Sequence, residues 1–357
     1  MEERGPRSAM SNDRQKRRVS LIDVAQAAGV SRATASLVLR ESPLVAAETR
    51  KRVRKAMTKL GYIYNRGAAN MRRNRSGSIG LLLCNIGSPF YAELMAGIDQ
   101  VMDAQDIVSL LANSVESPER QFRQLHRLRE YNVDGIVLCP AAGTSADLLD
   151  ELNRLSLPCV QTLRYLSPKK GDYVGADYEF GVEQAVEHLV RNGRRRIAFI
   201  GGNQLHSAAR ERLSGFRRAL HRHGLSHDLI LPTNLTSADG AEALDALLSR
   251  DNPADAAICY NDMVALGVTS RLLSKGLHPG AEFAVIGTDD LPNAATAWPA
   301  LTTIATNPRA VGEAAARLLL RRIEQPDGTE ERILLPPKLI IRDSCGGRTN
   351  TLERQAS

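Results

Sequence analysis

The sequence predicts a small all-α headpiece with a helix–turn–helix near the N-terminus, followed by a two-lobed α/β domain with parallel sheets. Three observations lead to this fold class. Two short helical patterns are joined at a glycine within residues 19–39, the basic charge is concentrated in the first fifth of the chain, and apolar strand-like runs alternate with amphipathic runs from residue 79 onward. A chain of 357 residues has room for both parts.

The first feature is the segment VSLIDVAQAAGVSRATASLVL at residues 19–39. Ser20 and Asp23 have the spacing of a capping box, in which the hydroxyl and the carboxylate satisfy free backbone N–H groups at a helix start. Gly29 ends this first helix, and Ser31 is placed to cap a second one. A helix–turn–helix inserts its second helix into the DNA major groove, with the first residues of that helix at the base edges.

A third helix is expected over residues 47–60. Val53, Met57 and Leu60 recur at helical spacing, and Gly61 follows as a C-terminal stop. The charge supports a nucleic-acid partner, because residues 1–76 contain eighteen Lys and Arg against six Asp and Glu, a net charge of +12. Since the whole chain carries +7, the remainder carries −5. Such a local basic excess is typical of a DNA-binding module joined to a domain with another purpose.

The larger part alternates strands and helices. Buried strands are expected at 79–84, 107–111, 135–139, 159–162, 196–202, 256–260 and 283–287, and helices at 90–104, 118–131, 178–192, 209–223, 239–250, 262–275 and 309–323. This alternation predicts parallel sheets covered by helices, and there are too many strands for one small sheet. Ligands of such folds bind beyond the carboxyl ends of the strands. Polar residues follow those ends here: Asn85, Arg164, Asn203, Asn261, Asp262, Asp289 and Asp290.

Several function classes lack their signatures. No apolar run of transmembrane length occurs, and residues 1–17 read as a basic disordered leader without the apolar segment of a secretory signal. The five cysteines are scattered without a C-x-x-C pair, so we expect small reduced core residues in a cytoplasmic protein. His221, His223 and His227 have no cysteine or paired carboxylate nearby, which argues against a metal site. G-x-G-x-x-G and G-x-S-x-G are absent, so we expect no cofactor and no enzyme.

A set of motifs in order along the chain resembles the lactose repressor/galactose repressor family of bacterial transcription regulators. The motifs are DVAQAAGVSRATAS, GYIYNRGAANM, SIGLL, PFYAELMAGI, VDGIVL, EHLVRNGRRRIAFIGG, RLSGFRRAL, NDMVALGV, VIGTDDLPNAATAWPALTTI and LPPKLIIRDS. The resemblance implies a homodimer that binds near-palindromic operator DNA. It also implies a two-lobed domain similar to periplasmic sugar-binding proteins, in which a small effector between the lobes changes the hinge geometry and so the affinity for the operator.

The patterns and the resemblance together imply the domain boundaries. We expect the headpiece at 18–64, a hinge helix or linker at 65–77, and the effector-binding and dimerisation domain at 78–343. Lobe one is expected to comprise about 78–173 and 306–332, and lobe two about 174–305 and 333–343. The tail at 344–357 is polar and lacks an apolar heptad repeat, so the resemblance implies a dimer and no tetramer.

The resemblance places Arg32 and Ala33 at the base edges. Arginine can donate two hydrogen bonds to guanine, and alanine offers a methyl contact; the alternative for Arg32 is a phosphate contact. The hydroxyls of Ser31, Thr34 and Ser36 suit phosphate contacts. Leu37 is a base reader or a packing residue. The remaining DNA-facing positions that we expect are Ser20, Tyr62 and Asn65.

In the hinge, Met71 occupies the position at which the family inserts an apolar wedge between the central base pairs of the operator. Methionine is among the side chains able to open such a step. Gly67 lowers the helix propensity of this segment, so we expect it to be disordered without DNA. The alternative is a plain linker with Met71 exposed.

The resemblance also implies an effector site. Its expected residues are Asn85, Tyr91, Arg164, Arg212, Asn261 and Asp289, each of which has a structural ion pair or hydrogen bond as its alternative. Leu163 replaces an aspartate common in the family, and Leu235 stands where an aromatic platform is usual. Two arginines against one carboxylate favour an acidic effector, such as a sugar acid, a sugar phosphate or a small organic acid. In the opposing hypothesis, Asp289 and Asp262 neutralise the arginines and leave an ordinary sugar site.

Together these features predict a sequence-specific DNA-binding regulator, in the first instance a repressor, that responds to a small molecule. The rival from another class is a ligand-binding protein whose headpiece binds DNA without sequence preference. The basic headpiece with its intact helix cap favours the regulator.

Overall fold

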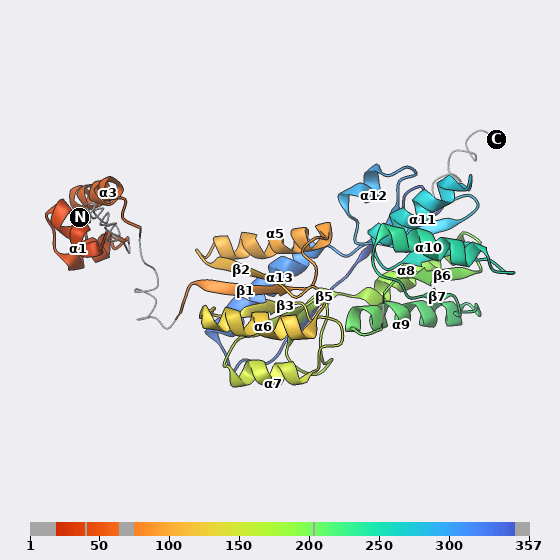
Figure 1. Cartoon of the computed structure of the whole chain (residues 1–357), viewed down its shortest axis with the longest axis horizontal. Coiled ribbons are helices and arrows are strands. Elements are labelled where there is room, and N and C mark those ends of the chain that lie inside the picture. Colours follow the sequence, from red (N-terminus) through yellow and green to blue (C-terminus); the bar gives the residue numbers. More distant parts are fainter. Residues whose placement is uncertain (1–18, 40, 64–74, 203, 347–357) are drawn as a thin grey trace, which may run out of the picture. The chain divides into compact units, whose positions relative to one another are not determined.

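The computed structural model describes residues 19–39, 41–63, 75–202 and 204–346. The chain divides into two compact units, residues 1–74 and residues 75–357 (Figure 1). Within these described ranges, no helix has both the length and the apolar character needed to cross a membrane.

The first unit is a three-helix headpiece that matches the sequence expectation. Its helices are α1 (Leu21–Ala28), α2 (Arg32–Leu39) and α3 (Ala47–Leu60). The Ser20–Asp23 capping box is present, and both Gly29 and Gly61 adopt the left-handed conformation that ends a helix. The buried core that holds the helices together consists of Val24, Ala25, Ala28, Ala35, Val38, Val45, Val53 and Ala56.

The second unit contains two six-stranded sheets. The first has the order β11-β5-β4-β3-β1-β2, and the second has the order β12-β10-β9-β8-β6-β7. The strands of the first sheet are β1 (Ser78–Leu83), β2 (Val108–Asn113), β3 (Ile136–Leu138), β4 (Cys159–Thr162), β5 (Asp172–Ala176) and β11 (Arg332–Leu335). Those of the second are β6 (Ile197–Ile200), β7 (Ile230–Leu231), β8 (Ala256–Cys259), β9 (Ala284–Thr288), β10 (Thr302–Ala305) and β12 (Lys338–Ile340). All pairs are parallel except the edge pair β10–β12.

Helices cover both faces of each sheet (Figure 1). Those of the first lobe are α5 (Pro89–Asp103), α6 (Pro118–Glu130), α7 (Asp147–Arg154) and α13 (Pro308–Glu324). Those of the second are α8 (Tyr178–Arg191), α9 (Ser207–Arg222), α10 (Ser237–Leu248), α11 (Asp262–Ser274) and the short α12 (Pro292–Thr296). Alternate strand residues face opposite layers: Leu81 and Leu83 of β1 join the core with α5 and α13, whereas Leu82 joins the core with α6 and α7.

The chain crosses between the lobes three times. It passes from β5 to α8, from β10 to α13, and from β11 to β12. The expected lobe boundary at residue 173 falls inside β5, so the first crossing follows Ala176. The seven expected strands and seven expected helices all occur, while β5, β7, β10, β11, β12, α7 and α12 were not anticipated.

Helices α5 and α13 of the first lobe pack closely against each other. A Cβ atom added at Gly97 would lie 2.0 Å from the carbonyl oxygen of Arg309, and one at Gly312 would lie 2.2 Å from that of Leu94. Only glycine allows the two helix backbones to approach so closely. Tyr91, in the first turn of α5, belongs to the same buried cluster as Leu83 of β1 and Val137 of β3.

Candidate DNA-binding and effector sites

The start of α2 presents the expected DNA-facing residues. Ser31, Arg32 and Ala33 are exposed, while Ala35 and Val38 anchor the opposite face in the headpiece core. Two hydroxyls are already engaged, because Ser31 Oγ accepts from the Thr34 amide at 3.0 Å and lies 2.9 Å from Thr34 Oγ1. The recognition helix is therefore capped before DNA arrives, and its first two side chains are available for contacts.

Other expected DNA-facing residues have a packing role. Ser20 Oγ donates to Asp23 Oδ2 at 2.7 Å as part of the α1 cap. Leu37 and Tyr62 are half-buried and pack against the headpiece core, which places Leu37 with the packing alternative. Ser36 is half-buried. Asn65 and Met71 lie outside the described residues.

The basic side chains of α3 fall into two groups. Some bind other groups of the headpiece, and the others are exposed. Arg50 donates to the carbonyl oxygens of Ser42 and Val45 at 3.2 and 3.1 Å, so it fixes the loop before its own helix. Arg54 forms an exposed ion pair with Glu41 at 3.2 Å. Lys51, Arg52, Lys55 and Lys59 are exposed, and they retain positive charge for phosphate attraction.

In the first lobe, Arg164 follows β4 and is only 5% exposed. Its two terminal nitrogens donate to the two carboxylate oxygens of Glu116, each at 2.9 Å. Its Nη1 also donates to the Pro140 carbonyl oxygen at 3.3 Å. Glu116 lies 48 residues away in the chain and was not predicted as a site residue. A two-pronged pair of this kind is the strongest geometry that arginine forms with a carboxylate.

A thiol and phenol cluster lies beneath Arg164. The sulfurs of Cys84 and Cys139 are 3.6 Å apart, and the Tyr91 hydroxyl lies 3.6 Å from Cys139 Sγ. Arg164 Nη1 is 3.7 Å from Cys84 Sγ. Burial raises the pKa of Tyr91, so this hydroxyl stays neutral. The structure thus brings two expected effector residues, Tyr91 and Arg164, to one place.

In the second lobe, Arg212 projects from α9 and is 3% exposed. Its guanidinium carbon lies 3.8 Å from the ring centroid of Tyr178 and 4.3 Å from that of Tyr260. Nη1 donates to the Ala208 carbonyl oxygen at 3.1 Å, whereas the buried Nε has no hydrogen-bond partner among the described groups. A desolvated guanidinium between two aromatic faces is stabilised by cation–π attraction, yet Nε remains an unused donor.

Asp289 is close enough to Arg212 for their charges to interact, and Asp262 in turn influences Asp289. Asp289 follows β9 with a φ of 117°, and burial raises its pKa well above the ordinary value, with Asp262 adding to the effect and Arg212 opposing it. Asp262 accepts from the Leu291 amide at 2.7 Å and from Thr303 Oγ1 at 2.5 Å. Burial raises the pKa of Asp262 to about 7. Asp262 therefore forms its hydrogen bonds within the second lobe and is not the partner of Arg164.

The two expected asparagines have local roles. Asn261 caps α11, where its Oδ1 accepts from the Val264 amide at 2.9 Å. Asn85 is exposed after β1, and its Oδ1 accepts from the Gly87 amide at 3.1 Å. Both asparagines therefore bond to neighbouring backbone groups, and it is the arginines that form the buried polar centre.

His206 lies close enough to both arginines for their charges to act on its ring, and it was not predicted from the sequence. It caps α9 through Nδ1, which accepts from the Ala209 amide at 3.2 Å, so the ring proton lies on Nε2. Burial and the positive charges of Arg164 and Arg212 lower its pKa to about 2. His206 is consequently a neutral hydrogen-bond donor at every physiological pH, with its ring edge toward Tyr260.

Direct contacts join the lobes around this cluster. The Tyr165 amide donates to Ser207 Oγ at 2.8 Å, and the Gly143 amide donates to the Leu205 carbonyl oxygen at 3.2 Å. Arg332 of β11 forms an ion pair with Glu211 of α9 at 3.3 Å. Because Glu211 directly precedes Arg212, the interlobe contacts and the buried polar centre are linked through one turn of α9.

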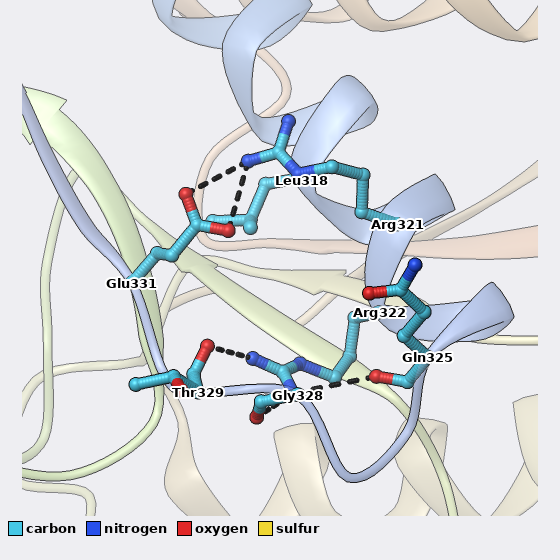
Figure 2. Close-up of a pocket in the computed structure, with 7 residues that line it drawn as sticks. All are labelled: Leu318, Arg321, Arg322, Gln325, Gly328, Thr329 and Glu331. Atoms are coloured by element: carbon cyan, nitrogen blue, oxygen red, sulfur yellow. Dashed lines mark hydrogen bonds and ion pairs between the residues drawn. The ribbon is translucent and has the colours of Figure 1, made fainter.

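A surface hollow elsewhere in the first lobe has a structural role. It has a volume of about 260 Å³ and lies where α13 ends and the chain turns toward β11 (Figure 2). Arg322 donates there to the Thr329 carbonyl oxygen at 2.7 Å and also forms a buried ion pair with Asp172 at 2.7 Å. Arg321 pairs with Glu331 at 2.9 Å. The charged groups of this hollow satisfy one another, so they hold the loop and leave no obvious role for a ligand.

The histidine cluster shows no metal arrangement. Within the part of the chain that the structure describes, no group of three His, Cys, Asp or Glu side chains is placed to hold a metal ion. His223 instead lies 2.8 Å from Glu187 on the neighbouring helix α8.

A helix–turn–helix headpiece joined to a two-lobed α/β domain defines a class of DNA-binding regulators that carry a ligand-binding domain. Residues 20–65 match the family described as bacterial regulatory proteins, lacI family, and residues 186–345 match the periplasmic binding protein-like domain. The maltose regulon regulatory protein MalI of Escherichia coli K12 is 31% identical, covering 91% of this chain and 98% of its own. The transcriptional repressor PurR of Vibrio vulnificus is also 31% identical, covering 90% and 97%.

Solved structures of similar proteins have the same fold. The lac repressor dimer bound to operator and the anti-inducer ONPF superimposes with a TM-score of 0.84 at 26% identity, covering 92% of this chain and 99% of that one. The complex of the transcriptional regulator CelR with cellobiose gives a TM-score of 0.70 at 31% identity, covering 92% and 100%. The chain belongs to the lacI family and is a sequence-specific DNA-binding transcription regulator controlled by a ligand.

Proposed function

We propose that this regulator is a cytoplasmic homodimeric repressor whose effector is a small acidic molecule bound between the lobes. The observation that carries the effector class is the pair of buried arginines, Arg164 and Arg212, one from each lobe. Arginine binds carboxylate and phosphate groups through paired hydrogen bonds, and it keeps its charge when buried.

The charges around the two arginines are unequal. Glu116 compensates Arg164 through two hydrogen bonds. Arg212 has Asp289 nearby, but burial favours the neutral form of that carboxyl. Arg212 also keeps an unused buried donor at Nε. An anionic group that reaches Arg212 therefore supplies both the missing charge and the missing hydrogen bond, which a neutral sugar hydroxyl does only in part.

Neutral donors and ring faces complete the proposed site. His206 offers an N–H group without adding charge, and Tyr178 and Tyr260 hold the Arg212 guanidinium in a fixed plane. We assign Asn85, Tyr91, Asn261 and Asp289 to the surroundings of the effector. The family likeness and the sequence position support the DNA-binding assignment of Arg32, Ala33, Asn65 and Met71. We assign no catalytic role and no cofactor to any of these residues.

A thermal-shift screen with matched ligands tests the effector class. Gluconate or glucose 6-phosphate should stabilise the protein more than glucose does, and other small organic acids extend the series. Arg212→Met keeps apolar bulk between the two tyrosines and should abolish the stabilisation. Arg217→Ala, which removes an exposed charge from the same helix, is the matched control and should preserve it. Stabilisation by the neutral member alone would contradict an acidic effector.

A further inference from the structure

The segment between β2 and α6 places the carboxylate of Glu116 in the proposed effector site. Glu116 binds both terminal nitrogens of Arg164 and also accepts from the Ala142 amide at 3.1 Å. No other carboxylate among the described residues forms an ion pair with Arg164. The positive charge of Arg164 is thus balanced by a carboxylate of the protein itself.

The two partners differ in their freedom to move. The Arg164 side chain is 7% exposed and is fixed by the Pro140 carbonyl oxygen, whereas the Glu116 side chain is 41% exposed. Glu116 can turn into water and regain its hydration, but Arg164 cannot follow it. A buried arginine left without a countercharge is strongly destabilising, so Glu116 stays in place until another anion replaces it.

The backbone conformation of the segment adds to this difference. Val115 and Glu116 have φ values of 52° and 56°, in the left-handed region. This region is unfavourable for a β-branched residue such as valine, and residues held there persist only when their surroundings fix them. The Glu116 contacts with Arg164 and Ala142 and the hydrogen bond from the Val115 amide to Asn113 Oδ1 help to fix this segment, as do the hydrogen bonds from Ser114 to the Leu83 carbonyl oxygen.

We propose that Glu116 is an internal competitor of the effector: its carboxylate occupies Arg164 in the ligand-free protein and is displaced by an anionic group of the ligand. This inference rests on the proposed effector site between the lobes. It makes Glu116 a specificity-determining residue, because a ligand must offer an anion that binds Arg164 better than Glu116 does. Neutral ligands leave the Glu116–Arg164 pair intact.

The test uses inorganic phosphate as the probe, so that it does not depend on the identity of the effector. The thermal unfolding midpoint of the full chain is followed against potassium phosphate, with potassium chloride at equal ionic strength as the reference. Glu116→Gln removes the competing charge and should bind phosphate about tenfold more tightly than the wild type. Glu119→Gln is the matched control, since Glu119 is exposed three residues later and bonds to Ser117. It should behave as the wild type.

A second variant tests whether Arg164 is the group that binds the additional phosphate. Glu116→Gln combined with Arg164→Met should lose the additional phosphate binding, which shows that the basic headpiece is not its source. If Glu116→Gln does not fold, Glu116→Asp, with its shorter side chain, replaces it and should show a smaller gain over the wild type. Equal phosphate responses in the wild type and in the Glu116 variant would overturn the proposal. If the Glu116 effect is found while gluconate and glucose 6-phosphate fail to stabilise the wild type, the assignment of an acidic effector fails separately.

Discussion

Arg32→Ala is the most direct perturbation of DNA reading. Arg32 is exposed at the first position of α2 and is not part of the headpiece core, so its removal should leave folding and dimerisation intact. Losing one two-pronged guanine contact costs about 1–3 kcal/mol per half-site. In a dimer on a two-fold operator this becomes about 2–6 kcal/mol, or roughly 30-fold to 10⁴-fold in the dissociation constant.

Fluorescence anisotropy on an operator selected from a random DNA library measures the loss of affinity caused by Arg32→Ala. Single base-pair changes in each half-site then show which base pair Arg32 contacts. Arg32→Lys keeps the charge but not the paired geometry, so it should lose specific affinity and keep non-specific affinity. Arg52→Ala removes an equal charge from the exposed face of α3 and should weaken all DNA sequences alike. If Arg32→Ala lowered the affinity for every sequence equally, Arg32 would be a phosphate contact, and the assignment to a base edge would be refuted.

Three further predictions concern the hinge, the assembly and the second lobe. Met71→Ala should reduce DNA bending together with affinity, and unchanged bending in a permutation gel assay would remove its wedge role. Sedimentation at micromolar concentration should give a dimer mass, whereas a tetramer would contradict the proposed homodimer. Asp262 has an ordinary pKa of 3.8, and burial raises it to about 7, so the folded chain retains a proton that the unfolded chain releases. The stability that this proton provides is full below about pH 4 and is lost as the pH rises to about 7; urea titrations should therefore show the wild type losing stability relative to Asp262→Asn across this window.

The headpiece and the central strands follow directly from local sequence. The capping box, the two glycine stops and the apolar spacing each determine structure over a few neighbouring residues, so all three helices were predictable. Three of the five missed strands, β7, β11 and β12, lie at the edges of the sheets, whereas β5 and β10 are next to an edge strand. β11 and β12 include exposed positions and β7 has only two residues, so none of these three forms the continuous apolar run that indicates a buried strand.

In the effector site, local sequence could not predict which residues contact each other. Arg164 and Arg212 were expected from the family resemblance, but their partners are distant in the chain. Glu116 reaches Arg164 only through two left-handed residues in a loop, and no periodicity marks such a position. His206 carried a weak signal, since it stands before a helix as a cap residue does, but histidine is not a usual cap. Tyr260 was visible as the last residue of an apolar run, but its stacking on Arg212 depends on the packing of two elements.

The central claim is that a small molecule between the lobes changes the affinity of the headpiece for its operator. The decisive measurement is the dissociation constant for the selected operator with and without the acid that gives the largest thermal shift, repeated with Arg212→Met. We expect the ligand to change this dissociation constant by about 5-fold to 150-fold in the wild type, the range of ordinary allosteric coupling, and not at all in Arg212→Met. An identical operator affinity with and without a ligand shown to bind the wild type would contradict it.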